Sequence, residues 1–128
     1  MDAQAALILW AMLIFQLKHF VCDFLLQTQA LVQKKHIYGH FAGLLHAGTH
    51  VIGSLPALIV LGANTRTIVI LMVAEFIVHY HADWLKARTD ETRAGVGQDS
   101  WFWMMFGLDQ FLHQMTYVAM IYFALRGL

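Results

Sequence analysis

Histidine and aspartate side chains occur in pairs four residues apart in each of the four longest apolar stretches of the sequence. In an α-helix, residues i and i+4 lie one above the other on the same face, so each stretch offers two side chains that can ligate a metal ion. Imidazoles mixed with carboxylates form a ligand set that suits zinc, iron or manganese rather than calcium or magnesium. The predicted metal ligands are His19, Asp23, His46, His50, His79, Asp83, Asp109 and His113.

A ligand set of this size suits two divalent ions better than one, and zinc is the first choice of metal. Helical bundles bind such ions through carboxylates and imidazoles that point inward from facing helices. Two-metal sites activate water and stabilise both oxygens of a displacement at phosphorus or carbon. The predicted chemistry is therefore metal-dependent hydrolysis, with Asp23 or Asp83 as the base. Glu75, one turn before His79, is a further candidate catalytic group or proton relay.

Each pair taken alone has a simpler explanation, because a hydrogen bond between polar side chains can hold two membrane helices together. An ionisable residue in the middle of a spanning helix costs about 2.5 to 3.5 kcal/mol on insertion scales. Serine, threonine or asparagine would hold helices together at a lower cost. The repeated use of aspartate therefore favours a functional cluster.

The composition around these pairs is that of a membrane protein. Hydrophobic residues make up 59% of the 128 residues and charged residues only 12%, whereas a soluble domain carries about 25% charged residues. Eight basic residues balance eight acidic ones, so there is no basic field that would attract nucleic acid. The single cysteine, Cys22, is expected to be a small buried side chain. The N-terminus lacks the basic region of a cleaved signal peptide, so we expect the first apolar stretch to remain in the mature protein.

Four stretches are predicted to span the membrane, since each has about 20 mostly apolar residues. The link "ARTDETRAGVGQDS" between the third and fourth spans is polar and is predicted to be a solvated loop. The predicted fold class is all-α, an integral membrane four-helix bundle in a single domain over residues 1–128. The predicted spans cover approximately Ala5–Gln27, Phe41–Gly62, Thr67–Lys86 and Trp101–Leu125.

The antiparallel order of these spans brings all four pairs to one depth. The pairs lie near the C-terminal ends of the first and third spans and in the N-terminal halves of the second and fourth. Each lies about 6 to 18 Å from the end that faces the first and third links. Five basic residues lie in or beside those two links and two on the opposite side. The positive-inside rule therefore places the links in the cytoplasm and both termini outside it.

The first two spans also resemble the last two in sequence. The segment "HFVCDFL" at 19–25 resembles "HYHADWL" at 79–85, an offset of 60 residues, and the partner pairs are offset by 63. The similarity predicts two related helical hairpins around an axis along the membrane normal. That axis would pass through the polar cluster.

The remaining polar residues of the spans are predicted to have simpler roles. Lys18 and Lys86 are expected to extend their ammonium groups toward the lipid head groups, with phosphate binding as the alternative for Lys86. His81 lies two positions from His79 and should point elsewhere on that helix. The glycines in and beside the second span are expected to allow close packing, namely Gly39, Gly43, Gly48 and Gly53.

The patterns "HFVCDFLLQ", "HYHADWLKAR" and "FGLDQFLHQ" resemble those of the small bacterial membrane proteins called domain of unknown function 3307. The resemblance covers nearly the whole chain and implies a helical bundle in the bacterial inner (cell) membrane, without an established activity. Cys22 stands where the family usually has glycine. The repeated H-x-x-x-D pattern is more loosely similar to membrane-bound metal-dependent hydrolases. That likeness is one of motif and implies no particular substrate.

Three functions follow from these features as alternatives. The first is hydrolysis of a lipid-type phosphate or ester near the cytoplasmic face, with the bilayer supplying the substrate. The second is an oxidoreductase that holds a di-iron centre or a haem. The third is a non-enzymatic unit for proton or metal transport, or a membrane scaffold. A homo-oligomer is compatible with all three, and no nucleic-acid partner is expected.

Overall fold

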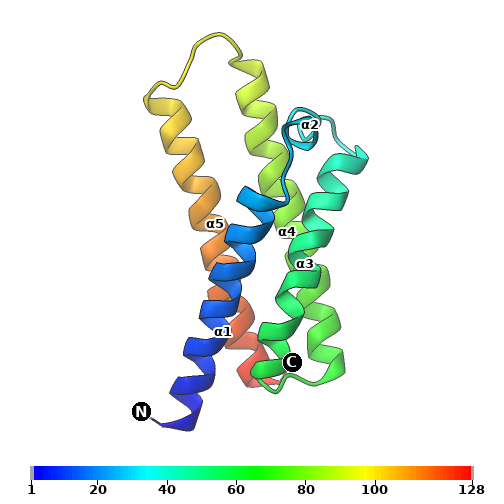
Figure 1. The fold of residues 1–128 in the computed structure, drawn as a ribbon, viewed down its shortest axis with the longest axis vertical. Coiled ribbons are helices and arrows are strands. Elements are labelled where there is room, and N and C mark those ends of the chain that lie inside the picture. Colours follow the sequence, from blue (N-terminus) through cyan, green and yellow to red (C-terminus); the bar gives the residue numbers. More distant parts are fainter. Residues whose placement is uncertain (1, 128) are drawn as a thin grey trace.

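The computed structural model describes residues 2–127, which form an all-helical chain without any strand (Figure 1). The predicted all-α class is confirmed for this part of the chain. The elements, in order, are α1 (Ala3–Phe20), the π-helix η1 (Val21–Leu25), α2 (Gln29–Val32), α3 (Phe41–Val60), α4 (Thr65–Thr92) and α5 (Ser100–Arg126).

Three helical segments are long and apolar enough to cross a membrane, which indicates a membrane protein. They are Ala3–Leu25, formed by α1 and η1 together, then α3 and α4. The fourth predicted span coincides with α5, but α5 is not among these three. The membrane character of the chain therefore rests on the first three predicted spans.

The third predicted span is too short. α4 continues beyond Lys86 to Thr92, so the first part of the predicted solvated loop is helical. The segment Lys86–Thr92 has neither proline nor glycine to end the helix, and the first glycine after it, Gly95, has a positive φ of 97°.

The connection between α4 and α5 ends at a capping aspartate. Asp99 accepts a hydrogen bond from the Phe102 N–H at 3.0 Å, as an N-cap residue does. It also pairs with Arg93 at 2.5 Å. The hydrogen bond from Phe102, aided by Arg93, holds the pKa of Asp99 below its ordinary value. The start of α5 is thus fixed by the polar sequence that precedes it.

The long helices pack in the order α1, α3, α4, α5, and α5 makes only a few contacts back to α1. The link that contains α2 and the connection between α4 and α5 lie at one end of the molecule, and both termini lie near the other (Figure 1). The end that carries the links is called the link end below. The opposite end is the terminal end.

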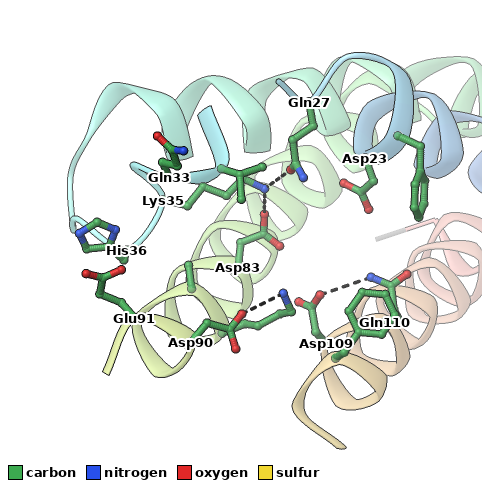
Figure 2. Close-up of a pocket in the computed structure, with 15 residues that line it drawn as sticks. Asp23, Gln27, Gln33, Lys35, His36, Asp83, Asp90, Glu91, Asp109 and Gln110 are labelled. Atoms are coloured by element: carbon green, nitrogen blue, oxygen red, sulfur yellow. Dashed lines mark hydrogen bonds and ion pairs between the residues drawn. The ribbon is translucent and has the colours of Figure 1, made fainter. Parts of the chain in front are cut away.

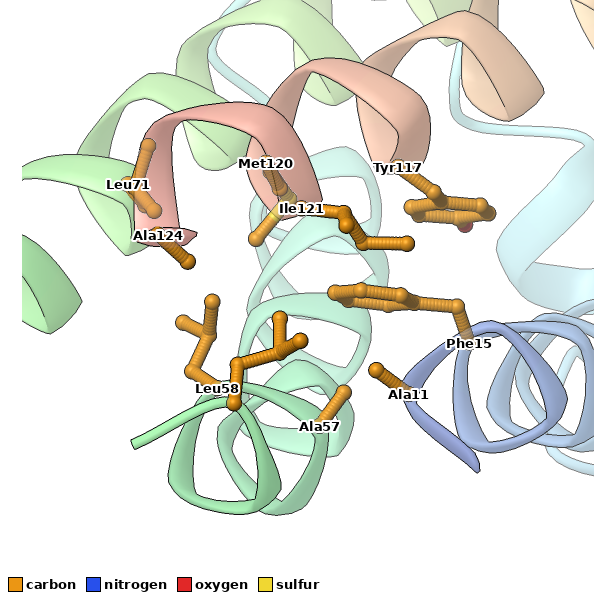
Figure 3. Close-up of a cluster of buried hydrophobic side chains, with 10 residues drawn as sticks. Ala11, Phe15, Ala57, Leu58, Leu71, Tyr117, Met120, Ile121 and Ala124 are labelled. Atoms are coloured by element: carbon orange, nitrogen blue, oxygen red, sulfur yellow. The ribbon is translucent and has the colours of Figure 1, made fainter. Parts of the chain in front are cut away.

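An apolar cluster fills the terminal end (Figure 3). Phe15 of α1 stacks on Tyr117 of α5 with ring centroids 5.0 Å apart and planes 5° from parallel. The small side chains of Ala11 and Ala57 are fully buried beside them, which lets α1 and α3 approach closely. The terminal end of the molecule is therefore filled by packed side chains.

The outer surface of α1 is apolar, as a lipid-facing surface must be. Leu9, Leu13 and Leu17 are 59%, 55% and 61% exposed. They follow one another at four-residue spacing on the face opposite Ala11 and Phe15. A water-soluble helix would carry polar residues at these positions, so this pattern supports the membrane assignment.

Only two of the four glycines predicted to allow close packing do so. A Cβ atom at Gly53 would lie 3.2 Å from the Lys18 Cβ, and one at Gly43 would lie 3.0 Å from the Tyr80 ring. Gly48 has no neighbour within 4 Å at that position. Gly39 has a positive φ of 76° and belongs to the turn before α3.

The glycines of α3 provide a test of this packing. We expect Gly53→Leu to destabilise the protein by about 1 to 3 kcal/mol, because the larger side chain overpacks the contact between α1 and α3. Thermal unfolding in detergent measures the effect. Gly48→Leu is the matched control and should be neutral or slightly stabilising, because leucine favours the helix over glycine. Equal unfolding temperatures for the two variants would contradict the packing described here.

Candidate metal centre

All eight predicted ligands meet in one polar cluster between α1, η1, α3, α4 and α5. We call it the His/Asp cluster. Its members are His19, Asp23, His46, His50, His79, Asp83, Asp109 and His113, and Asp23 and Asp83 form its two hubs. The residues that the depth argument groups from the sequence therefore lie together in the structure, while their role as metal ligands stays a prediction.

Asp23 of η1 is the first hub, and three histidines surround its carboxylate. The His19 Nε2 lies 3.1 Å from Oδ2, one turn earlier on the same helical segment. From α3, the Nε2 atoms of His46 and His50 lie 3.1 and 3.0 Å from Oδ1. The carboxylate thus joins α1 and η1 to α3.

Asp83 of α4 is the second hub and is built in a similar way. The His113 Nε2 lies 3.1 Å from Oδ1, and the His79 Nε2 lies 3.7 Å from Oδ2. The His46 Nε2 lies 3.2 Å from the same Oδ2, so this imidazole connects both hubs. Asp109 extends the second hub through His113, whose Nε2 is 3.2 Å from Asp109 Oδ1.

The backbone around Asp23 departs from the α-helix. Residues 21–25 form the π-helix η1, in which the Leu26 N–H bonds to the Val21 carbonyl at 2.9 Å. Single π-turns inside α-helices are rare and often occur at functional sites. Hydropathy and i, i+4 spacing carry no signal for this turn, and the sequence did not predict it.

Several buried atoms of the cluster lie close together without hydrogen bonds. The Nε2 atoms of His46 and His79 and the Oδ1 of Asp109 are buried and have no partner with hydrogen-bond geometry. Buried polar atoms are normally satisfied, and short distances without suitable angles are not hydrogen bonds. A cation that accepts their lone pairs would satisfy these atoms, so the donor set fits a metal ion.

Two overlapping groups of side chains are close enough to one another to hold such an ion. His46, His50 and His79 form one, and His79, Asp83 and His113 form the other, with the ligand atoms of each within 4.8 Å of one another. Ligands bonded to zinc at about 2.1 Å in a tetrahedral site lie about 3.4 Å apart. Side-chain movements on the order of 1 Å would close either group around an ion.

A cavity of about 330 Å³ opens from the cluster toward the link end (Figure 2). Three cluster carboxylates line it, those of Asp23, Asp83 and Asp109. Its wall also includes Lys35 from the first link and Lys86 from α4. The cavity gives a ligand access to the carboxylates of the cluster, whereas its imidazoles do not line the cavity.

Lys35 is a site residue that sequence reasoning missed. The sequence predicts only that Lys35 is one of the basic residues of the first link, yet it is 8% exposed. Its Nζ donates to Asp83 Oδ2 at 2.6 Å and to the Gln27 side chain, as Figure 2 shows. A lysine in a polar link carries no signal that it folds back, whereas the exposed Lys34 beside it behaves as expected.

Two residues of α5 that hold His19 were missed as well. The Tyr117 hydroxyl lies 2.9 Å from His19 Nδ1, and the Gln110 Oε1 lies 3.0 Å from Nε2. These contacts join α1 to α5, which touch each other less than α1 touches α3 or α4 touches α5. Gln110 follows Asp109 directly in the sequence, but an amide beside a predicted ligand is too common to single out.

The prediction for Lys18 is wrong, because this side chain points inward instead of toward the head groups. Lys18 is 7% exposed, and its Nζ lies 2.5 Å from Glu75 Oε1 and donates to the His50 carbonyl at 3.2 Å. Ser54 also donates to Glu75 Oε1, at 2.8 Å. A lysine buried in the bundle needs a carboxylate within reach to offset its desolvation.

This ion pair defines the position of Glu75. The residue does not line the cavity, and its Oε1 is bound by Lys18 and Ser54. Both partners of Glu75, Lys18 and Ser54, also donate to the His50 carbonyl, at 3.2 Å each. The catalytic role assigned to Glu75 from the sequence stays a prediction.

Of two other polar residues of α4, His81 lies where the sequence predicts, whereas Lys86 belongs to the cavity wall. His81 is exposed and points away from the cluster, with its Nε2 3.1 Å from the Tyr38 hydroxyl. Lys86 lies in the cavity wall and pairs with Asp90 at 3.3 Å. Its Nζ is 5.6 Å from the centre of the Phe106 ring. Cys22 is buried, as predicted.

The fold and the cluster define a small all-helical membrane protein with a buried His/Asp centre. The model of the family described as protein of unknown function (DUF3307) matches residues 9–127. The chain therefore belongs to this family, as the sequence motifs predicted. No curated protein and no solved structure matches the chain, so the looser likeness to metal-dependent hydrolases gains no support from these comparisons.

The buried pair of Lys18 and Glu75 can be tested by a double-mutant cycle. Lys18→Met should destabilise the protein by about 3 to 5 kcal/mol, because it leaves a buried carboxylate without its cation. Adding Glu75→Gln should restore most of this loss, since the charge is removed and Ser54 keeps an acceptor. Thermal unfolding of the two single variants and the double variant in detergent gives the coupling energy. Additive effects would contradict the pairing.

Proposed function

We propose that this protein is a membrane-embedded, metal-dependent hydrolase that acts on a lipid-type phosphate or ester near the cytoplasmic face. One observation carries the proposal, namely the convergence of the His/Asp cluster beneath a cavity lined by three of its carboxylates. A purely structural cluster would have no need of an open side. The cavity opens at the link end, which is the end that the basic residues assign to the cytoplasm.

The proposal includes a four-helix bundle that spans the bacterial inner membrane four times. Three of these spans would be the helical segments that are long and apolar enough to cross a membrane, and α5 would be the fourth. It buries Asp109 and His113 against the spanning helices and packs along α4. Its 27 residues would extend about 40 Å as an α-helix, enough to cross a bilayer. Both termini would then lie outside the cytoplasm.

Zinc is the proposed metal, with iron or manganese as the alternatives. A group of three histidines, and a second group of two histidines with one carboxylate, are the ligand types of zinc sites that keep a coordination position open. One or two divalent ions at such a site activate water and stabilise charge on phosphoryl or acyl oxygens. His46, His50, His79, Asp83 and His113 would hold them.

The chain's own residues would do the rest of the chemistry from the cavity wall. Asp23 faces the cavity with a carboxylate that three histidines hold in place, so it can accept a proton from attacking water. Asp109 also lines the cavity, and its Oδ1 is free of hydrogen bonds. The buried imidazoles behind them keep bulk water on the open side only.

The packing of the molecule argues against a haem and against transport. The imidazole rings lie against one another, with centroids 3.9 Å apart for His50 and His79 and 4.2 Å for His79 and His113. This spacing suits small ions and offers no slot for a porphyrin. Transport would need a polar path through the terminal end, where the apolar cluster around Phe15 and Tyr117 fills the interior.

Metal content is the first test of this proposal. We expect protein purified in detergent without chelator to carry about one or two zinc ions per chain by elemental analysis. The variant with both His46→Ala and Asp83→Ala should lose the metal, because it removes a ligand from each group and the imidazole that joins the hubs.

The control for this experiment is His81→Ala, which removes an exposed histidine from α4, the helix that carries Asp83. This variant should keep its metal. Repeated preparations of the wild-type protein without stoichiometric metal at neutral pH would overturn the proposal. So would a double variant that keeps its metal.

Single cysteines test the four-span topology. In a Cys22→Ala background, we expect a cysteine at Thr65 or Arg126 to react with a membrane-impermeant thiol reagent added outside intact cells. A cysteine at Ala94 should react only after the membrane is opened. All three positions are exposed. Labelling of Arg126 and Ala94 from the same side would mean that α5 does not cross the membrane.

A further inference from the structure

We propose that the cavity binds the phosphate group of an amphiphile, with Lys35 and Lys86 on the phosphate and the apolar part leaving past Phe24 and Phe106. This inference rests on the proposed function, since it names the class of substrate for the same site. It adds the residues that bind the phosphate and the direction in which the apolar part of the ligand extends. The cavity volume of about 330 Å³ is in the range of ligand sites rather than of a single ion.

Lys35 is the residue on which the inference mainly depends. Its neighbour Lys34 is exposed, but Lys35 is 92% buried, folds over the cavity and donates to Asp83 at 2.6 Å. Burying an ammonium group is costly unless an anion compensates it. A metal ion bound to Asp83 would neutralise part of the charge of the same carboxylate. Lys35 would then lack a full counter-charge. A phosphate oxygen in the cavity would supply it through a charge-assisted hydrogen bond.

The charges of the cavity wall make this binding depend on metal. Two lysines face five carboxylates, those of Asp23, Asp83, Asp90, Glu91 and Asp109. Without a metal ion the wall is therefore net acidic and repels a phosphate. One divalent ion on the cluster would offset most of the excess of three negative charges, and two ions would more than offset it. The site would then attract a dianion, and Lys35 and Lys86 would orient it.

The apolar part of the ligand has one suitable direction to leave. Phe24 of η1 and Phe106 of α5 line the same cavity as the charged residues. Phe24 is 61% exposed on the surface of the molecule, and α1 touches α5 less than it touches α3. The wall between η1 and α5 is therefore the apolar side of the cavity, and it faces the bilayer. A phosphate on a hydrocarbon chain matches this pairing of charged and aromatic walls.

Calorimetry on zinc-loaded, desalted protein in detergent tests the inference with two probes. One is dihexanoyl phosphatidic acid, which carries a phosphate monoester on an apolar body, and the other is glycerol 3-phosphate, which carries the same group without it. We expect the lipid to bind and the soluble ester to bind at least about tenfold more weakly, given the apolar area it lacks. Removal of the metal by chelator should abolish binding of both.

Adjacent lysines supply matched variants. Lys35→Gln should weaken binding of the lipid about 10- to 100-fold through loss of a charge-assisted hydrogen bond, and Lys34→Gln should leave it within about twofold. Lys86→Gln, in the partly exposed part of the wall, should also weaken binding and guards against a folding defect in Lys35→Gln. Thermal unfolding and metal content are measured for every variant.

The outcomes separate the two proposals. Protein without metal overturns both. Metal-loaded wild-type protein that binds neither probe, or a Lys35→Gln variant that binds as Lys34→Gln does, overturns the phosphate site and leaves the metal centre standing. Equal affinity for glycerol 3-phosphate and the lipid overturns the amphiphile and identifies a soluble phosphate ester instead.

Discussion

A carboxylate inside a membrane bundle has to be neutralised by groups that touch it, because neither lipid nor distant water can solvate it. In this protein Asp23 and Asp83 meet that requirement by collecting imidazoles from every long helix. The same contacts hold α1, α3, α4 and α5 in register. Folding and the candidate chemistry therefore depend on one set of interactions, and removing either hub aspartate would disturb both.

The interior of the molecule is polar toward the link end and apolar toward the terminal end, and both parts hold the helices together. Toward the terminal end, the stack of Phe15 on Tyr117 and the side chains around it form a buried cluster whose members include no Asp, Glu, Lys, Arg or His. Tyr117 belongs to both parts, since its ring lies in the apolar cluster and its hydroxyl contacts His19. The pair of Lys18 and Glu75 lies beside this boundary. In the described part of the chain, the cavity thus reaches the cluster from the link end.

The sequence predicted the membership of the cluster because two simple rules apply to it. Helical spacing puts His19 over Asp23 and His79 over Asp83, and antiparallel order brings the pairs to one depth. The rest could not be found in this way. Hydropathy treats every lysine in a span or link as an interfacial residue, so the inward positions of Lys18 and Lys35 were missed. The length of α4 was missed because a polar sequence without glycine or proline can be a helix as well as a loop.

The two halves of the internal similarity are not equivalent, and the difference bears on the number of ions. His50 corresponds to His113, but His46 corresponds to Asp109. The two ligand groups differ as well: the first is made of nitrogen atoms alone, while the second includes the carboxylate of Asp83, and His79 belongs to both. A neutral imidazole offers one nitrogen lone pair to a metal ion, because its other ring nitrogen carries a proton. Two ions held together would have to use both nitrogens of His79, or one group would have to be completed by Asp23. A single ion that exchanges between the two groups needs neither.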